Sequence, residues 1–529
     1  MSWIVLGENK RLIELRSKPS DNELEGLLSV GSFLTVTNKK TSSKIILRVE
    51  DSIQIEPYAP TPLTVEMDLE GLVHDEKCYN KIIASRLKDL STRDDGKFDF
   101  IYPRSIAERS TVDEIREAIG SYTNGPFIFP ATVYNNQSNL IKSAEGNFMN
   151  VGLNNYMFWH QTVLCGETGS GKTVAIKYLA NHFVKNLDGC VIALNVKEDD
   201  LLHMEKPTTE TNDTILKEWD SINMTALGID NFEIYQPSGS ASPSSSVDGS
   251  RVHKITLKIM DLDPESLLGL IREQMSPIAT RWFPEIFRSW QDSVKSKSDV
   301  KFIDFVNYFD EIFNDNRLFP TLDINGTVSA QEMPGQTCGN ISRAISLAVK
   351  FFDTDAKPVD VTDFLQKGKF STIDLSGDDA IEFGSIFLRH ILKVINKEKS
   401  SGKYENTPVL VIVDEAHKFH SKDQGTSEAL KYLEQIARTG RSREMGIIFA
   451  SQDLATIPTG LTNIVGTLIS FRTQDKTTAG KLNVKGEDLK SLGDGYAVAQ
   501  IHKMPHLKWV KFPMTPSGVQ RKRRESIEK

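Results

Sequence analysis

The stretch that decides the fold is Thr162-Val163-Leu164-Cys165-Gly166-Glu167-Thr168-Gly169-Ser170-Gly171-Lys172-Thr173. An apolar run of strand type leads into a segment that fits the pattern G-x-x-x-x-G-K-[ST], and a helical pattern follows as far as Leu187. Glycines let successive backbone N–H groups turn toward phosphate oxygens, and the start of the helix adds a positive dipole. We therefore predict a phosphate-binding loop, and an unliganded turn at a helix start is the alternative.

The loop predicts ATP and Mg²⁺ as the cofactors. Lys172 is expected to reach the β- and γ-phosphates, and the Thr173 hydroxyl is expected to bind Mg²⁺. The complete set of predicted nucleotide contacts is Gly166, Glu167, Thr168, Gly169, Ser170, Gly171, Lys172, Thr173 and Val174.

A second apolar run, Val409 to Val413, ends in Asp414-Glu415. Asp414 is predicted to hold the Mg²⁺ through water, and Glu415 to orient or deprotonate the attacking water. Apolar strands that end in Asp-Glu are also common as purely structural features. The phosphate-binding loop upstream is what favours the catalytic interpretation.

Further candidates follow this strand. Hydrolysis needs positive charge at the γ-phosphate in the transition state. Ring-shaped assemblies supply it as an arginine from the neighbouring subunit, and Arg441 and Arg438 are the candidates here. Gln452 ends the next apolar strand and is predicted to sense the γ-phosphate or the water. A solvated helix end for the arginines and an ordinary turn for Gln452 are the structural alternatives.

Alternation of apolar strands with amphipathic helices predicts an α/β fold, a RecA-like core with a parallel sheet. The first 150 residues contain short β-rich runs, such as Phe33–Thr37 and Lys44–Val49, and a helix at Val112–Ile119 capped by Ser110 or Thr111. Between the halves of the core the pattern becomes helical without strands. The predicted division is a β-barrel-like domain at 1–150, the core at 151–262 and 355–515, an inserted helical subdomain at 263–354 and a basic tail at 516–529.

Composition excludes few functions. The 529 residues carry a formal net charge of -8, which does not indicate a surface that binds nucleic acid. The charge is compatible with lysines concentrated in a channel. Four cysteines without a CxxC spacing argue against a zinc site or a disulfide framework. We find no apolar run long enough to span a membrane and no signal peptide, so we expect a cytoplasmic protein.

Together these motifs resemble the HerA branch of the HerA–FtsK ATPases. The segments that carry the resemblance are Trp159–Cys165 with the loop that follows, Val413–Phe419, Ala437–Arg441, Phe449–Gln452 and Thr462–Arg472. The N-terminal β-rich region is similar in position to the small barrel of that family. Two segments depart from the family pattern: Asn195–Asp200 stands where an Asp is usual, and Gln452-Asp453-Leu454 replaces Gln-Arg-Pro.

The resemblance implies a homohexameric ring that moves double-stranded DNA with a nuclease or another effector protein, in DNA-end processing or anti-phage defence. Lys197 and the stretch Lys418–Lys422 are candidate DNA contacts, with a solvated face as the alternative. A scaffold that binds ATP to assemble an effector without processive movement needs the same residues, so the sequence leaves that reading open. A protein-remodelling ring is less favoured, since no aromatic peptide-gripping motif is recognisable near the loop.

Overall fold

Strand β10 (Thr162–Cys165), which carries the phosphate-binding loop, lies inside a 14-stranded sheet in the computed structural model of the chain. The strand order is β16-β13-β12-β17-β11-β18-β19-β10-β20-β21-β22-β7-β8, and β9 pairs with β7. The structure describes residues 2–9, 12–17, 28–55, 79–91, 99–134, 137–143, 145–197, 200–210, 212–238, 247–262, 264–265, 267, 277–376, 380–419, 440–457, 462–463, 465–504, 506 and 508–520.

The strands of this sheet have the following bounds: β7 (Phe127–Tyr134), β8 (Gln137–Leu140), β9 (Val151–Gly152), β11 (Cys190–Asn195), β12 (Phe232–Pro237), β13 (Val252–Thr256), β16 (Lys357–Pro358), β17 (Phe370–Asp374), β18 (Val409–Val413), β19 (Met445–Ser451), β20 (Thr467–Ser470), β21 (Tyr496–Gln500) and β22 (Trp509–Lys511). From β16 to β20 neighbouring strands run parallel, and from β20 to β8 they run antiparallel.

Both faces of the parallel part are covered. Successive residues Val163 and Leu164 of β10 belong to two different hydrophobic clusters, one on each face of the sheet. Helix α3 (Lys172–Asn186) contributes Phe183 to one cluster, and α8 (Ala380–Ser400) contributes Phe387 to the other. Strands buried on both sides need continuous apolar runs, which explains why the sequence predicts them well. The predicted α/β class is confirmed.

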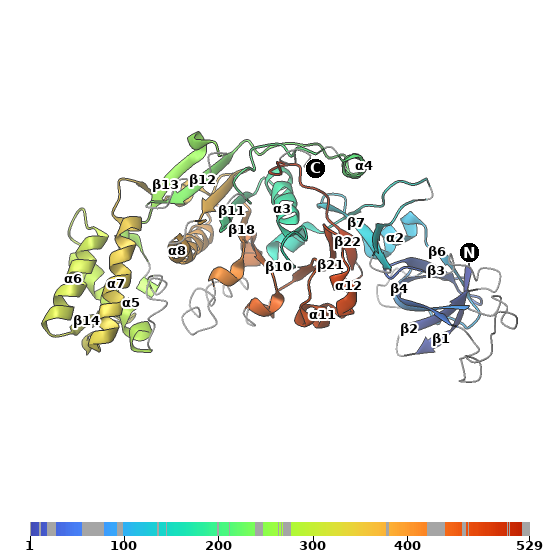
Figure 1. Cartoon of the computed structure of the whole chain (residues 1–529), viewed down its shortest axis with the longest axis horizontal. Coiled ribbons are helices and arrows are strands. Elements are labelled where there is room, and N and C mark those ends of the chain that lie inside the picture. Colours follow the sequence, from blue (N-terminus) through green and yellow to red (C-terminus); the bar gives the residue numbers. More distant parts are fainter. Residues whose placement is uncertain are drawn as a thin grey trace, which may run out of the picture.

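A closed barrel forms the N-terminal part of the chain, as predicted (Figure 1). Its antiparallel strands run in the order β1 (Ser2–Asn9), β2 (Leu12–Ser17), β5 (Tyr79–Asp89), β4 (Lys44–Ile55), β3 (Phe33–Thr37) and β6 (Ile106–Arg109). Apolar residues from these strands fill the barrel with a core of its own. The sequence also predicts a strand at 63–67 and a surface loop rich in Ser, Pro and Gly at 238–250. That strand and most of that loop lie outside the described residues.

The barrel ends before residue 150. Helix α2 (Val112–Ile119) follows β6 and is capped by Thr111, one of the two predicted caps. Thr111 forms a capping box with Glu114: the N–H of Glu114 donates to the Thr111 hydroxyl at 3.3 Å, and the N–H of Thr111 donates to the Glu114 carboxylate at 3.0 Å. Strand β7 comes next and pairs with β22 at the far end of the large sheet, with Pro130 opposite Val510. Residues from Phe127 onward therefore extend the large sheet.

The barrel contacts this antiparallel end of the sheet directly. Arg48 donates to the carbonyl of His506 at 2.6 Å, and the Lys485 ammonium lies 3.1 Å from the Asp51 carboxylate. A bridge between Val30 and Val133 adds backbone hydrogen bonds. These contacts join the barrel to β7 and to the segments before and after β21.

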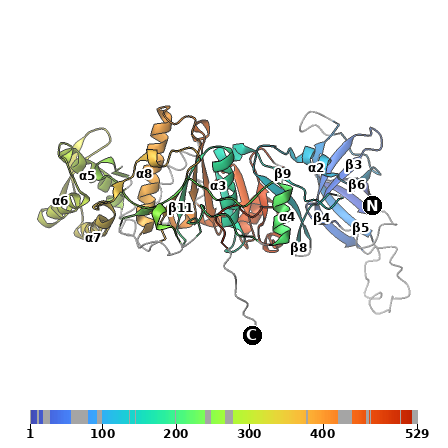
Figure 2. The same cartoon turned by 90° about the horizontal axis from the view of Figure 1, so that it is seen from above.

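The inserted subdomain lies at the opposite end of an elongated molecule (Figures 1 and 2). It contains α5 (Pro277–Val294), α6 (Phe302–Asp315) and α7 (Gly335–Phe352) around a core of aromatic side chains. The expectation of helices without strands is wrong, because a hairpin of β14 (Leu318–Leu322) and β15 (Val328–Glu332) separates α6 from α7. Asp323 and Gly326, at φ +85°, form the turn between these short strands.

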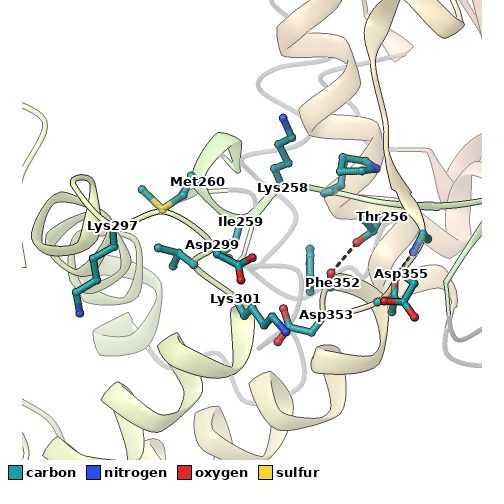
Figure 3. A pocket seen from close by; sticks show the side chains of 15 residues that line it. Thr256, Lys258, Ile259, Met260, Lys297, Asp299, Lys301, Phe352, Asp353 and Asp355 are labelled. Atoms are coloured by element: carbon teal, nitrogen blue, oxygen red, sulfur yellow. Dashed lines mark hydrogen bonds between the residues drawn. The ribbon is translucent and has the colours of Figure 1, made fainter.

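The insertion leaves and re-enters the sheet at one edge. Strand β16 pairs with β13, with Lys357 opposite Ile255 and Pro358 opposite Thr256. The Thr256 hydroxyl lies 2.7 Å from the carbonyl of Phe351 and 3.0 Å from that of Phe352, at the end of α7. Figure 3 shows this junction, which lines a pocket of about 590 Å³.

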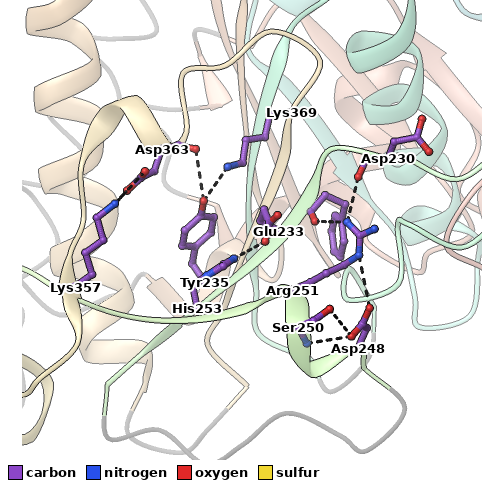
Figure 4. A network of polar contacts seen from close by, with 11 residues as sticks. Asp230, Glu233, Tyr235, Asp248, Ser250, Arg251, His253, Lys357, Asp363 and Lys369 are labelled. Carbon is purple, nitrogen blue, oxygen red and sulfur yellow. Dashed lines mark hydrogen bonds and ion pairs between the residues drawn. The ribbon is translucent and has the colours of Figure 1, made fainter.

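A polar network covers the adjoining strands β12, β13 and β17 (Figure 4). Lys369 donates to the Tyr235 hydroxyl at 2.9 Å, and His253 lies against the Glu233 carboxylate. Arg251 donates to the carbonyl of Phe232 at 2.9 Å. These contacts connect neighbouring strands at the edge of the sheet.

None of the described helices has the length and apolar character that crossing a membrane requires.

Candidate nucleotide-binding site

The loop after β10 crosses the carboxyl edge of the parallel strands. Cys165 at the end of β10 lies opposite Ser451 of β19 and Ser470 of β20. The N–H of Gly166 donates to the carbonyl of Gln452 at 2.9 Å, and the N–H of Glu167 donates to the carbonyl of Arg472 at 2.8 Å. The residues after β19 and β20 therefore hold the first half of the loop at the edge where ligands of open α/β sheets bind.

Gly171 has to be glycine for two reasons. Its φ of +108° is a conformation that side chains rarely adopt, and a Cβ there would lie 2.8 Å from the backbone nitrogen of Gly495. The Gly495 N–H donates to the carbonyl of Ser170 at 2.9 Å. The turn before β21 thus packs directly against the loop and fixes the residue that precedes α3.

The start of α3 is arranged to receive an anion. Gly171 is the N-cap and has no side chain to satisfy the first backbone N–H groups of this 15-residue helix. Lys172 is buried, and its ammonium donates to the carbonyl of Glu167 at 3.0 Å and also to that of Gly166. Burial, followed by the positive charge of Lys197, lowers the pKa of Lys172. Helix and lysine together fit a polyphosphate.

Oxygen ligands suited to Mg²⁺ gather beside the loop. Asp414 at the end of β18 accepts the N–H of Glu415 through Oδ1 at 3.0 Å, while its Oδ2 is buried and has no hydrogen-bond partner among the described residues. Burial raises the pKa of Asp414 to about 6, so a cation that compensates its charge would be stabilising there. The Thr173 hydroxyl donates to Asp200 at 3.4 Å. Hydroxyl and carboxylate oxygens of this kind fit Mg²⁺.

Glu415 is held in an unusual conformation. Its φ of +48° is uncommon for a residue other than glycine, and its side chain is buried. Lys197 lies against its Oε1, and the Nδ1 of His417 lies 3.2 Å from its Oε2. Backbone strain of this kind persists only where the surroundings enforce it, and it gathers at functional sites.

The structure thus brings together Lys172, Thr173, Asp414 and Glu415, the centre of the predicted site. Gln452 also lies here; its carbonyl binds the loop and its side chain is exposed.

The two predicted arginines lie wholly or partly outside the described residues. The backbone of Arg441 lies in a short 3-10 helix, Gly440–Arg443, but its side chain and all of Arg438 lie outside what is described. The trans role of both therefore stays a prediction.

Sequence reasoning missed three charged residues at this edge. Lys197, expected to contact DNA, lies against Glu415, and Asp200 lies beside Thr173. Arg472 has its guanidinium 3.1 Å from Asp494 and 3.8 Å from Glu167. All three follow the carboxyl end of a strand, β11 or β20, so the rule that ligands bind at this edge would have selected them.

Comparison with known proteins agrees with this geometry. Residues 139–395 match the family model of the central domain of helicase HerA. The DNA double-strand break repair helicase HerA of Sulfurisphaera tokodaii is 24% identical over 198 residues, which are 36% of this chain and 39% of that protein. The protein of the same name from Sulfolobus acidocaldarius is 30% identical over 97 residues, 18% of this chain and 19% of that one. The chain therefore spans well under half the length of either relative.

Solved structures show the same fold. The plasmid coupling protein TrwB with the ATP analogue ADPNP superimposes with a TM-score of 0.51 at 12% identity, over 79% of this chain and 94% of TrwB. TrwB with ADP and Mg²⁺ gives 0.50 at 11% identity, with the same coverage. Motifs, site geometry and the HerA family model agree on a P-loop ATPase core similar to that of the HerA–FtsK type, and the TrwB structures share its fold.

Proposed function

We propose that this chain is an ATP-driven motor that moves double-stranded DNA. The observation that carries the proposal is the position of Glu415, a buried carboxylate next to the residue predicted to hold Mg²⁺ and close to the lysine of the phosphate-binding loop. A carboxylate in that position can accept a proton from a water that attacks the terminal phosphate. ATP is the nucleotide and Mg²⁺ the metal that the loop, Thr173 and Asp414 would hold.

The DNA substrate is inferred from the relatives. Both archaeal proteins are DNA double-strand break repair helicases, and the family model is that of the HerA central domain. A translocating motor grips the phosphates of DNA with lysines and arginines, so binding should weaken as salt rises. In keeping with the family resemblance, the working assembly would be a hexameric ring acting with a nuclease or another effector protein, in DNA-end processing or anti-phage defence.

The ring would also complete the site. Hydrolysis in ring-shaped ATPases uses an arginine supplied by the neighbouring subunit, and Arg441 or Arg438 would supply it here. A subunit with Arg441→Ala should then poison a mixed ring, so activity should fall more steeply than the fraction of mutant subunits. A linear fall would argue against the shared site. The mass of the nucleotide-bound assembly by light scattering tests the hexamer itself.

Two substitutions test the ATPase. Lys172→Ala should abolish nucleotide binding, and Glu415→Gln should bind ATP without turning it over. Lys185→Met is a matched control, because Lys185 also lies on α3 but at its last turn, with only a weak ion pair 3.8 Å from Asp230. Unaltered turnover in either site variant would refute the assigned roles.

Movement along DNA needs its own assay. The protein should hydrolyse ATP faster with duplex DNA and should displace the third strand of a triplex. Hydrolysis without displacement would instead indicate a scaffold that uses ATP to assemble an effector. Stimulation by unfolded protein, and none by DNA, would point to a remodelling ring.

A further inference from the structure

The contact between Lys197 and Glu415 joins two residues that differ in their freedom to move. The Glu415 side chain is 2% exposed, whereas that of Lys197 is 32% exposed and reaches into the site from the loop after β11. The carboxylate is confined by its burial and its strained backbone, as described above. Of the two partners, the lysine is the one that can leave.

The backbone that carries Lys197 is fixed. Asn195 is fully buried, and its side chain donates to the carbonyl of Lys197 and, at 3.3 Å, to Asp374. Its Oδ1 accepts the N–H of Leu201 at 3.3 Å. The long, flexible side chain of Lys197 can therefore carry its ammonium to a second partner while the hydrogen bond to its own carbonyl is kept.

Lys197 belongs to the same group of charges as the phosphate-binding lysine. Burial lowers the pKa of Lys197, but its contact with Glu415 and the charges of Asp414, Glu415 and Asp200 outweigh burial and raise it. Its own charge depresses the pKa of Lys172. The two ammonium groups thus interact with the same two carboxylates, Asp414 and Glu415.

A triphosphate on the loop changes this balance. It adds several negative charges next to Lys172, and these compete with Glu415 for the Lys197 ammonium. While Lys197 occupies Oε1, Glu415 has that oxygen engaged and is a poorer acceptor for a proton from water. Charge complementarity at a phosphate favours a second cation there.

We propose that Lys197 alternates between two anions: it pairs with Glu415 when the site holds no terminal phosphate, and it moves to the terminal phosphate of a bound nucleoside triphosphate. The transfer frees the Glu415 carboxylate for the attacking water and lets the site distinguish ATP from ADP. This inference rests on the proposed ATPase function but not on DNA translocation.

A thermal double-mutant cycle tests the pairing of Lys197 with Glu415 in the site without nucleotide. The melting temperatures of the wild type, Lys197→Met, Glu415→Gln and the double variant are compared with and without a non-hydrolysable ATP analogue. Without nucleotide, Lys197→Met should lower the melting temperature, because it takes the cation away from Oε1 of a buried carboxylate, and Glu415→Gln should restore it. With the analogue, this coupling should disappear. Coupling of the same size in both conditions would overturn the proposal.

Binding measurements test the second position of the lysine. Lys197→Met should weaken binding of the ATP analogue about tenfold more than binding of ADP, and Lys197→Arg should recover most of that difference. Lys185→Met is the control, because the Lys185 side chain is 31% exposed, close to the exposure of Lys197, and it should change neither affinity. Equal loss for ADP and analogue would show a merely structural role and refute the transfer. Lys197→Gln serves the same test if the Met variant does not fold. None of these readouts needs turnover or DNA, so a failure of the proposed motor is seen separately.

Discussion

His182 makes the stability of α3 depend on pH. The ring lies on the third turn of the helix, stacked on Phe158 with ring centroids 6.1 Å apart, and its Nε2 is 3.2 Å from Oδ1 of Asn155. Burial lowers the pKa of His182 from 6.5 to about 4. Since α3 begins at the phosphate-binding loop, loosening this helix would disturb the nucleotide site.

The direction in which stability changes with pH follows from proton binding at His182. Between pH 6.5 and about 4 the unfolded chain binds a proton at His182 that the folded chain does not, so stability falls as pH falls through this window. The difference between the pKa values of the unfolded and folded states corresponds to about 3.4 kcal/mol of stability. About 2 kcal/mol of it is lost between pH 7.5 and 5.0. Well above pH 6.5, from about pH 7.5, His182 is neutral in both states and adds no pH dependence.

Hydrogen exchange of the α3 backbone amides measures the opening free energy of this helix. His182→Gln keeps a donor for Asn155 but cannot be protonated. The opening free energy of the wild type should fall between pH 7.5 and 5.0 by about 2 kcal/mol more than that of the variant. Equal pH dependence in the two proteins would refute the assignment to His182.

Four further outcomes are expected. Gly171→Ala should lower ADP affinity about a hundredfold or more because its Cβ meets the Gly495 backbone, whereas Gly169→Ala, which has open space and a φ of +80°, should cost only about 1 to 2 kcal/mol of binding free energy, about 5- to 30-fold; equal effects in a binding titration would contradict this. Phe305→Ala should destabilise the insertion by about 3 to 5 kcal/mol in denaturant unfolding and leave ADP affinity unchanged. Lys511→Met should destabilise the protein by about 3 to 5 kcal/mol, since it leaves the buried Glu218 unpaired, and adding Glu218→Gln should reverse the loss. Chelation of Mg²⁺ should stop turnover, and turnover that persists in excess chelator would exclude the metal role of Thr173 and Asp414.

The central strands could be predicted to within about a residue because both of their faces are buried. Val409–Val413 and Cys190–Asn195 are entirely buried, so their apolar runs are uninterrupted. Barrel strands such as Tyr79–Asp89 alternate buried and partly exposed positions and carry charges, which hides them in a search for apolar runs. The hairpin at Leu318–Glu332 consists of two 5-residue strands, too short to stand out between helices.

The site was predictable where one motif contains its residues. Lys172 and Thr173 follow from the loop itself, and Glu415 follows from its place after a buried strand. Lys197 and Arg472 come from separate strands, and only the parallel pairing of β10 with β20 and of β11 with β18 brings them to the same edge. Their partners depend on that register, which a single sequence does not contain.

The two ends of the insertion meet on neighbouring strands, and this makes the insertion an exchangeable module. The chain departs after Thr256 and returns at Lys357, and these positions belong to paired strands at the margin of the sheet. Because β13 and β16 run parallel, a connector of about a dozen residues could cross from the end of one to the start of the other and leave every central strand intact. Evolution, or an engineer, can therefore enlarge, replace or delete about a hundred residues here while the ATPase core keeps its connectivity.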